Sequence, residues 1–286
     1  MKDLPKLLLP LLAIVVVFSS CKNGRSWFGG SSADTLCIDT YKFDKVDSTA
    51  ERVVEVKIEA DYPAAITGPL SANVASWIRS NIGKDNTTQA PDTMNGQKVV
   101  DFFGRQIFDS YAGEEVYPSS MSYIASAKLV CKRRNYVSYV LNVYEYTGGA
   151  HGMTAVSGAT FSQIDGRRYG WELLKDTAKT GFHKLMKKGV RKYFSSNISK
   201  GEITDEELCG MLLLNIDGAP VTAQQLDRFP LPSNPPYFTR KGVNFVYSSY
   251  EIAPYAAGIP AFVIDFEDIK DYLSKEGKAL IKKKDK

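Results

Sequence analysis

Apolar and charged residues alternate over residues 54–60, where the chain runs Val-Glu-Val-Lys-Ile-Glu-Ala. A period of two places every second side chain on the same face, so this run predicts a half-buried β-strand. Asp61-Tyr62-Pro63 is expected to end that strand.

Two helical patterns follow the strand. Pro69 suits the first turn of the first helix, and Gly83 suits its end. The apolar stripes consist of Leu70, Val74, Trp77, Ile78 and Ile82 in the first helix, and of Val99, Phe103, Ile107 and Tyr111 in the second. Both helices therefore have one face to bury.

The middle of the chain is rich in β-forming residues. Three such runs cover residues 122–132, 136–146 and 154–162, and short polar or glycine-rich segments join them. A parallel connection needs a dozen or more residues, so these neighbours are predicted to be antiparallel.

Short helices and strands make up the last third of the chain. Thr204, with Glu207 three residues later, predicts a capping box at the start of a helix. Aromatic pairs on both sides of Lys241-Gly242 predict a hairpin, residues 261–266 a final strand, and residues 267–273 a closing helix. The whole pattern predicts the α+β class: an antiparallel β-sheet from both halves, packed by helices, in two intimately associated sub-domains.

Thr180 is expected to cap a helix whose outer side is basic. That side carries Lys184, Lys187, Lys188, Arg191 and Lys192. Such a charge run is either a solvated helix face or a surface for anionic lipid or glycan.

The first residues have the order of an export signal. Two lysines and an apolar run over 7–18 precede Ser19-Ser20 and then Cys21. The run is too short to span a bilayer, which takes about 20 apolar residues, so residues 1–20 are predicted to be a signal peptide. A cysteine after small residues resembles the lipobox of bacterial lipoproteins, which implies a lipid on Cys21 as the membrane anchor. The alternative is an ordinary cleaved signal that ends beside a cysteine.

Two segments are predicted to lie outside the folded core. Residues 21–49 are rich in Gly, Ser, Lys and Asp, which favours a flexible tether between lipid and fold. Residues 278–286 are mostly lysine and are expected to be a basic tail that frays.

Composition sets the size of the core and the classes of partner. A chain of 286 residues with 44% hydrophobic content can bury a large core without disulfides or metals. Its net charge of +4 is small for this length, so nucleic acid is not an expected partner. Besides Cys21, the cysteines are Cys37, Cys131 and Cys209, which allow one disulfide with a spare thiol or three free thiols. Their spacing matches no metal site, and no cofactor motif is present.

Two segments resemble a known family. The first runs Tyr144-Glu145-Tyr146-Thr147-Gly148-Gly149-Ala150-His151-Gly152, with Asp165-Gly166 after it, and the second runs Tyr250-Glu251-Ile252-Ala253-Pro254-Tyr255-Ala256-Ala257-Gly258. They are similar to signatures of the paired extracytoplasmic bacterial domains DUF4163 and DUF3298. The resemblance implies a DUF4163-like sub-domain over residues 50–147 and a DUF3298-like sub-domain over 148–277.

The family resemblance also bears on function. Relatives form the non-catalytic part of a peptidoglycan deacetylase and the lysozyme-sensing part of an anti-sigma factor, while many others are lipoproteins of unknown role. In the deacetylase, chemistry resides in a separate metal-dependent domain. The resemblance therefore favours binding or sensing over catalysis.

The predicted ligand site combines both signatures. Its residues are Tyr144, Tyr146, His151, Tyr250, Glu251 and Tyr255. His151 is either a polar group at a groove or a turn residue that satisfies nearby backbone, and Glu251 is either buried with partners or exposed at a pocket rim. We expect Glu251 and His151 to lie near one another, with the tyrosines around them as a platform for sugar or peptide.

These observations give one leading function and two alternatives. The leading hypothesis is a non-catalytic lipoprotein of the cell envelope, periplasmic or surface-facing, that binds peptidoglycan, another polysaccharide or a lysozyme-like protein. The first alternative is a hydrolase of peptidoglycan or polysaccharide that uses His151 and Glu251 as acid/base groups. The second is a structural lipoprotein without a small ligand.

Overall fold

The computed structural model describes residues 36–49, 52–83, 90–91, 93–113 and 120–282. The predicted signal peptide and the lipid site at Cys21 lie outside these residues. In the described part of the chain, no helix has both the length and the apolar character that a bilayer span requires.

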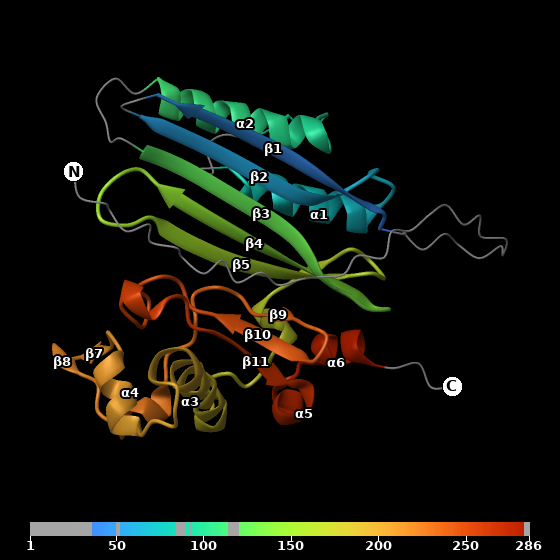
Figure 1. The fold of residues 1–286 in the computed structure, drawn as a ribbon. Helices are drawn as coiled ribbons and strands as arrows, with labels where there is room; N and C mark the ends of the chain where they lie inside the picture. The colour runs from blue at the N-terminus through green and yellow to red at the C-terminus, as the bar shows by residue number, and fades with distance from the viewer. Residues whose placement is uncertain (1–35, 50–51, 84–89, 92, 114–119, 283–286) are drawn as a thin grey trace, which may run out of the picture. The chain divides into compact units, whose positions relative to one another are not determined.

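Six strands form the larger sheet of the described residues, in the order β1-β2-β3-β4-β5-β6 (Figure 1). They are β1 (Ile38–Ser48), β2 (Val53–Pro63), β3 (Ser120–Lys132), β4 (Tyr136–Tyr146), β5 (Met153–Ser162) and β6 (Arg168–Tyr169). The predicted antiparallel run β3-β4-β5 is confirmed. By contrast β2 and β3 pair in parallel, because α1 and α2 lie between them in the chain and allow a crossover.

Helices α1 (Pro69–Asn81) and α2 (Gln97–Ala112) bury their predicted stripes against this sheet. Val54, Val56, Ile58 and Ala60 of β2 face the same core and are almost fully buried. The period of two in the strand and the helical period in α1 and α2 therefore meet in one apolar layer.

Part of the segment that was predicted to be a flexible tether forms strand β1 instead. Residues 21–49 were expected to be flexible, yet Ile38–Ser48 pairs along the whole length of β2. Only a few side chains of β1 are half-buried; among them Phe43 packs on Gly104 of α2, where an added Cβ would overlap its ring. A largely polar edge strand of this kind does not show a strong apolar period, which is why the sequence pattern misses it.

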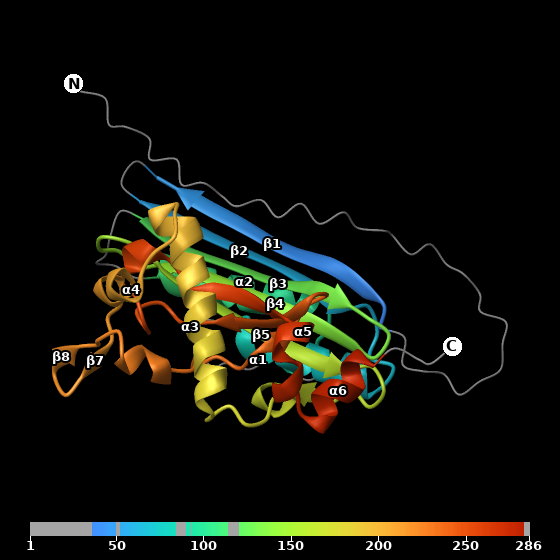
Figure 2. The same cartoon turned by 90° about the horizontal axis from the view of Figure 1, so that it is seen from below.

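A second sheet, in the order β11-β10-β9, lies in the C-terminal half. Its strands are β9 (Tyr237–Phe238), β10 (Gly242–Val246) and β11 (Ala261–Asp265), as the hairpin and final strand predicted. Helix α3 (Thr180–Phe194) lies across it (Figure 2). The remaining elements are α4 (Asp205–Met211), the small hairpin β7 (Asn215–Ile216) and β8 (Ala219–Pro220), α5 (Phe266–Ile269) and α6 (Lys275–Ile281). The two halves thus contribute separate sheets, not a single shared one.

The two sheets meet through specific contacts inside one unit, residues 33–286. Thr160 Oγ1 of β5 accepts a hydrogen bond from Phe238 N of β9 at 2.8 Å, and Tyr136 donates through its hydroxyl to Thr239 O at 2.9 Å. The predicted boundary at 147/148 falls inside the β4–β5 hairpin, because β5 and β6 complete the first sheet. The structural division follows β6.

Two basic segments are more integrated than their charge suggested. Helix α6 covers part of the predicted tail from residue 278, and its Leu280 is buried while Ser274 caps it by accepting from Gly277 N. On α3, Lys187 pairs with Asp205 at 3.1 Å and with Asp227 at 2.9 Å. Part of the basic face of α3 therefore holds neighbouring segments in place.

The cysteines of the described residues are free thiols. Cys37 is exposed, Cys131 is buried and Cys209 is intermediate. Burial raises the pKa of the Cys131 thiol, which makes it a structural apolar side chain.

Candidate functional site

The site begins with the glycine-rich loop between β4 and β5. Gly148 and Gly149 adopt positive φ angles of 99° and 90°, which non-glycine residues rarely tolerate. At Gly152 an added Cβ would overlap the Tyr144 ring, so this glycine allows the loop to close over that tyrosine. The loop holds His151 at one end of the larger sheet.

His151 is held on three sides. Its ring stacks on Tyr255, with centroids 3.7 Å apart and planes 11° apart. Nδ1 lies 3.0 Å from Gly152 O, and Nε2 lies 3.1 Å from the Tyr250 hydroxyl. A carbonyl can only accept, so Nδ1 carries the proton, and Nε2 of the neutral ring then accepts from Tyr250. The imidazole is therefore fixed in orientation and tautomer.

Tyr250 is an exposed member of this cluster, as is His151. Its side chain is 46% exposed, and its backbone adopts a φ of 63°, in the left-handed region. Such a conformation costs a bulky residue about 1–3 kcal/mol and is often found at functional sites. The ring lies 6.2 Å from Tyr255 and 6.3 Å from His151, so three rings form one partly open aromatic cluster.

Tyr144 and Tyr146 support the loop. The Tyr146 hydroxyl donates to Gly149 O at 3.0 Å. The pKa of Tyr144 is raised first by burial and then by the nearby phenols of Tyr255 and Tyr146. Five of the six predicted residues are therefore brought together around the glycine-rich loop.

Glu251 has hydrogen-bond partners on both of its carboxylate oxygens. Its Oε1 accepts from Ser233 N at 2.7 Å and its Oε2 from Ser248 N at 2.6 Å. The carboxylate ties two loops together through their backbone amides, and the preceding residue, Tyr250, bonds His151. Of the two interpretations of Glu251, the structure supports the partnered one.

Sequence reasoning missed a groove lined by residues that lie beside this cluster in the chain. Its volume is about 290 Å³, and it is lined by Val143, Glu145, Met153, Thr154, Ala155, Val156, Ser157, Asn234, Ser248 and Ser249. Met153 and Ser249 lie close in the chain to His151 and Tyr250, respectively. Ser249 donates to Thr154 O at 2.9 Å, and Asn234 donates to Ser248 Oγ at 3.0 Å. The only sequence signal for these residues is their position beside the two signatures.

The second histidine is not part of this site. His183 lies on α3, where its Nδ1 contacts Phe229 O. Within the described ranges, no three His, Cys, Asp or Glu side chains gather as metal ligands would.

Comparisons with known proteins match both halves. Residues 50–154 match the family model described as deacetylase PdaC, and residues 177–267 match that of DUF3298, a protein family of unknown function. The expected DUF3298 resemblance is therefore confirmed. No curated protein matches the chain.

Solved structures show the same fold. A DUF3298 family member from Bacteroides fragilis NCTC 9343 has 17% identity and a TM-score of 0.63, over 87% of this chain and 97% of that one. A DUF3298 family protein from Pseudomonas aeruginosa PAO1 has 17% identity and a TM-score of 0.59, over 85% and 96% of the two chains. At this identity the likeness supports the α+β fold alone.

Proposed function

We propose that this chain, which matches the PdaC family model over residues 50–154 and the DUF3298 model over residues 177–267, binds a cell-wall glycan through the cluster of His151, Tyr250 and Tyr255. We further propose that it is a lipoprotein of the bacterial cell envelope, anchored through Cys21. The observation that carries the binding proposal is the exposed Tyr250, held in a strained backbone beside a fixed imidazole.

The chemistry of the cluster suits a sugar. Aromatic faces pack against the apolar C–H face of a sugar ring, while nearby polar groups bond its hydroxyls. In the adjoining groove the carboxylate of Glu145, the amide of Asn234 and the hydroxyls of Ser248 and Ser249 offer both donors and acceptors. A flat aromatic group next to short polar side chains supports binding of a glycan chain.

The hydrolase alternative is less well supported. A general acid or base must exchange a proton with substrate, which requires an accessible carboxyl oxygen. Both oxygens of Glu251 already accept short hydrogen bonds from backbone amides. These bonds hold the carboxylate as a link between two loops, which favours a structural role for Glu251 over an acid/base role.

Sedimentation of the protein with purified, insoluble peptidoglycan tests the binding proposal. We expect Tyr250→Ala and Tyr255→Ala each to weaken binding by about tenfold or more, because aromatic side chains dominate such contacts. Ile164→Ala, at a residue 79% exposed on another turn, serves as the surface control and should bind like the wild type. If the wild type stays in the supernatant, or if the tyrosine variants sediment normally, the proposal is wrong.

A second binding experiment distinguishes a glycan ligand from a protein ligand. Immobilised hen lysozyme presents a glycan-acting protein without peptidoglycan. Tyr250-dependent capture by lysozyme, with no binding to peptidoglycan, would replace the glycan proposal with a protein-binding one.

Radiolabelled palmitate tests the anchor. The expressed wild type should incorporate label and fractionate with membranes, because several acyl chains hold a protein at a bilayer without a spanning helix. Cys21→Ser should lose both properties. Equal fractionation of the two proteins would overturn the lipoprotein proposal and leave glycan binding to be judged separately.

A further inference from the structure

Strand β11 forms an open edge of the smaller sheet. It pairs with β10 on one side only, in the order β11-β10-β9. Tyr247 N donates to Pro260 O, and Phe266 N donates to Lys241 O. These bonds at the two ends of the β10–β11 pair determine which residues between them form hydrogen-bonded pairs. Residues 260, 262, 264 and 266 therefore exchange bonds with β10, while the peptide groups of 261, 263 and 265 point away from it.

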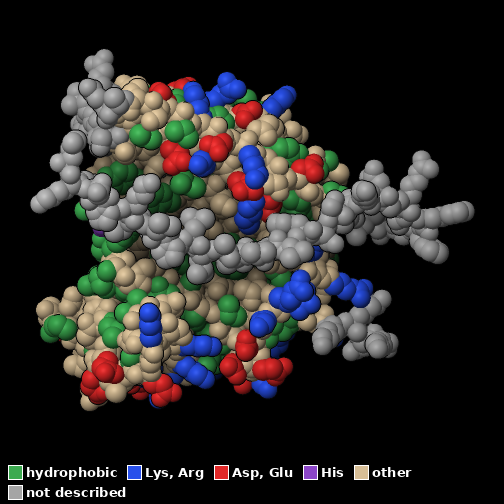
Figure 3. Space-filling view, in the orientation of Figure 1, with side chains coloured by type: hydrophobic (Ala, Val, Ile, Leu, Met, Phe, Trp, Pro, Cys, Tyr) green, Lys and Arg blue, Asp and Glu red, His purple; other side chains and the backbone are tan. Residues whose placement is uncertain are grey.

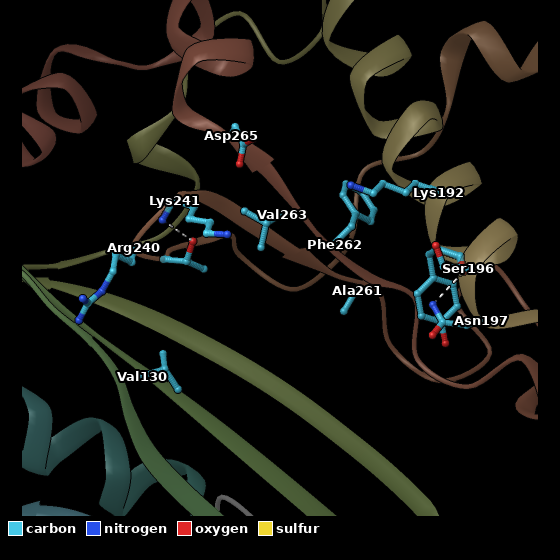
Figure 4. A pocket seen from close by; sticks show the side chains of 12 residues that line it. Val130, Lys192, Ser196, Asn197, Arg240, Lys241, Ala261, Phe262, Val263 and Asp265 are labelled. Carbon is cyan, nitrogen blue, oxygen red and sulfur yellow. Dashed lines mark hydrogen bonds between the residues drawn. The ribbon is translucent and has the colours of Figure 1, made fainter. Parts of the chain in front are cut away.

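Most of these outward peptide groups have no partner within the described part of the chain. Ala261 and Val263 have no hydrogen bond there from their backbone N–H or to their C=O, and Asp265 has none from its N–H, while its C=O begins helix α5 as the N-cap. Instead they line a cavity of about 660 Å³, drawn in Figure 4. A row of free donors and acceptors along a strand is the template that an added strand requires.

The cavity has an apolar floor. Val263 of β11 is 42% exposed and Val130 of β3 is 46% exposed, and both belong to its lining. Val263 shares a sheet face with Asn244, its partner on β10, while its neighbours Phe262 and Ile264 point into the core around α3. An added strand would thus find apolar contacts at alternate positions.

The rim of the cavity is basic. Lys192 of α3 and Arg240 and Lys241 of the β9–β10 turn line it, against the single carboxylate of Asp265. On the face seen in Figure 3, Lys and Arg side chains gather near the middle. A partner with acidic side chains complements this charge.

We propose that the outer edge of β11 binds an extended acidic peptide segment of another protein as an added strand. The backbone of the segment would bond the outward N–H and C=O groups of Ala261 and Val263 and the N–H of Asp265, and its alternate side chains would meet Val130 and the basic rim. This site is separate from the His151 cluster, so the two proposals fail independently.

The probe is a fluorescent peptide of about ten residues in which valine and glutamate alternate, measured by anisotropy against the full mature protein. We expect saturable binding that weakens as salt is raised. A peptide of the same composition with a central proline cannot complete the ladder and should bind at least about tenfold more weakly. No binding up to about 1 mM, or equal binding of both peptides, would overturn the proposal.

Val263→Pro tests the edge directly. It removes one outward N–H and leaves the ladder to β10 intact, because proline is tolerated where the N–H faces away from the neighbouring strand. We expect binding to fall about tenfold or more, while the matched control Val263→Thr, which keeps the N–H, binds like the wild type. Unchanged binding in a folded Val263→Pro protein would contradict strand addition.

If Val263→Pro does not fold, a variant with reversed charges on the rim tests the proposal instead. Lys192→Glu combined with Lys241→Glu should reverse the preference, so that a valine–lysine peptide binds more tightly than the valine–glutamate one. If the doubly substituted protein still preferred the valine–glutamate peptide, the two lysines would not face the bound segment, and the assignment would be wrong.

Discussion

Glu251 illustrates how the partners of a carboxylate decide its role. From the sequence, an acidic residue among aromatic neighbours suited both a catalytic pair and a structural network. In the fold, two backbone amides take both of its oxygens, from Ser233 and Ser248. The first partner lies eighteen residues away and donates through its backbone, so no side-chain pattern marks it.

Tyr250 gives the sharpest prediction at the level of single residues. Tyr250→Gly should unfold at higher urea concentration than Tyr250→Ala, with a difference of about 1 kcal/mol, because only glycine adopts positive φ without cost. Both variants lose the same ring and the same hydrogen bond to His151, so each controls for the other. Equal stability of the two would contradict the left-handed backbone at this position.

The aromatic part of the site was predictable for a physical reason. The glycines beside His151 mark a loop that needs positive φ, and the tyrosines stand within a few residues of that loop or of Tyr250. Short-range pattern therefore marked each segment, while the expectation that the two segments meet came from the family resemblance, because His151 and Tyr250 are 99 residues apart. The groove could not be found in this way, because Glu145, Asn234 and Ser248 meet only when the β4–β5 hairpin and two later loops fold together.

At the scale of elements, the two sheets approach each other closely at Gly158 of β5. Its position would bring an added Cβ into the Tyr237 ring of β9. We expect Gly158→Ala to lower the free energy of unfolding by about 1–3 kcal/mol, because the ring must move out of a packed layer. Urea unfolding followed by circular dichroism measures the change.

Gly210 supplies the matched control for this substitution. It lies in α4 with nothing within 4 Å of an added Cβ, so Gly210→Ala should be neutral or stabilise by up to about 1 kcal/mol. An equal loss in both variants would mean that Tyr237 does not rest on Gly158.

Elements with a strong period were predictable, and those without one were not. The stripes of α1 and α2 and the alternation of β2 identified those elements, since each buries a continuous apolar face. Strand β1 is mostly exposed, so its sequence resembles a linker although its backbone pairs fully with β2. The parallel β2–β3 pair was also missed, because strand order depends on how the helices cross over.

At the scale of the whole molecule, buried tyrosines should limit stability at high pH. Burial raises the pKa of Tyr237 to about 12, and it also raises those of Tyr123, Tyr136, Tyr139 and Tyr247. In the unfolded chain a phenol ionises near pH 10, so each buried phenol adds stability that is complete below about pH 10 and is lost as the pH rises toward its folded value. Urea midpoints from about pH 8 to 11 should therefore fall steeply at the alkaline end.

Tyr237→Phe checks the assignment to these phenols. This variant has one fewer group to ionise, so its stability should decline less steeply above about pH 10 than that of the wild type. Parallel pH curves for the two proteins would show that Tyr237 does not contribute.

The parallel pair of β2 and β3 also affects how the chain folds. Neighbours in the β3–β4–β5 run are joined by short turns, whereas Val53 meets Ser120 only after the intervening helices are positioned. Closing such a long loop costs entropy before any contact compensates for it. Pulse-labelled hydrogen exchange during refolding should therefore show the amides of β3, β4 and β5 protected first, with β1 and β2 joining the growing sheet last.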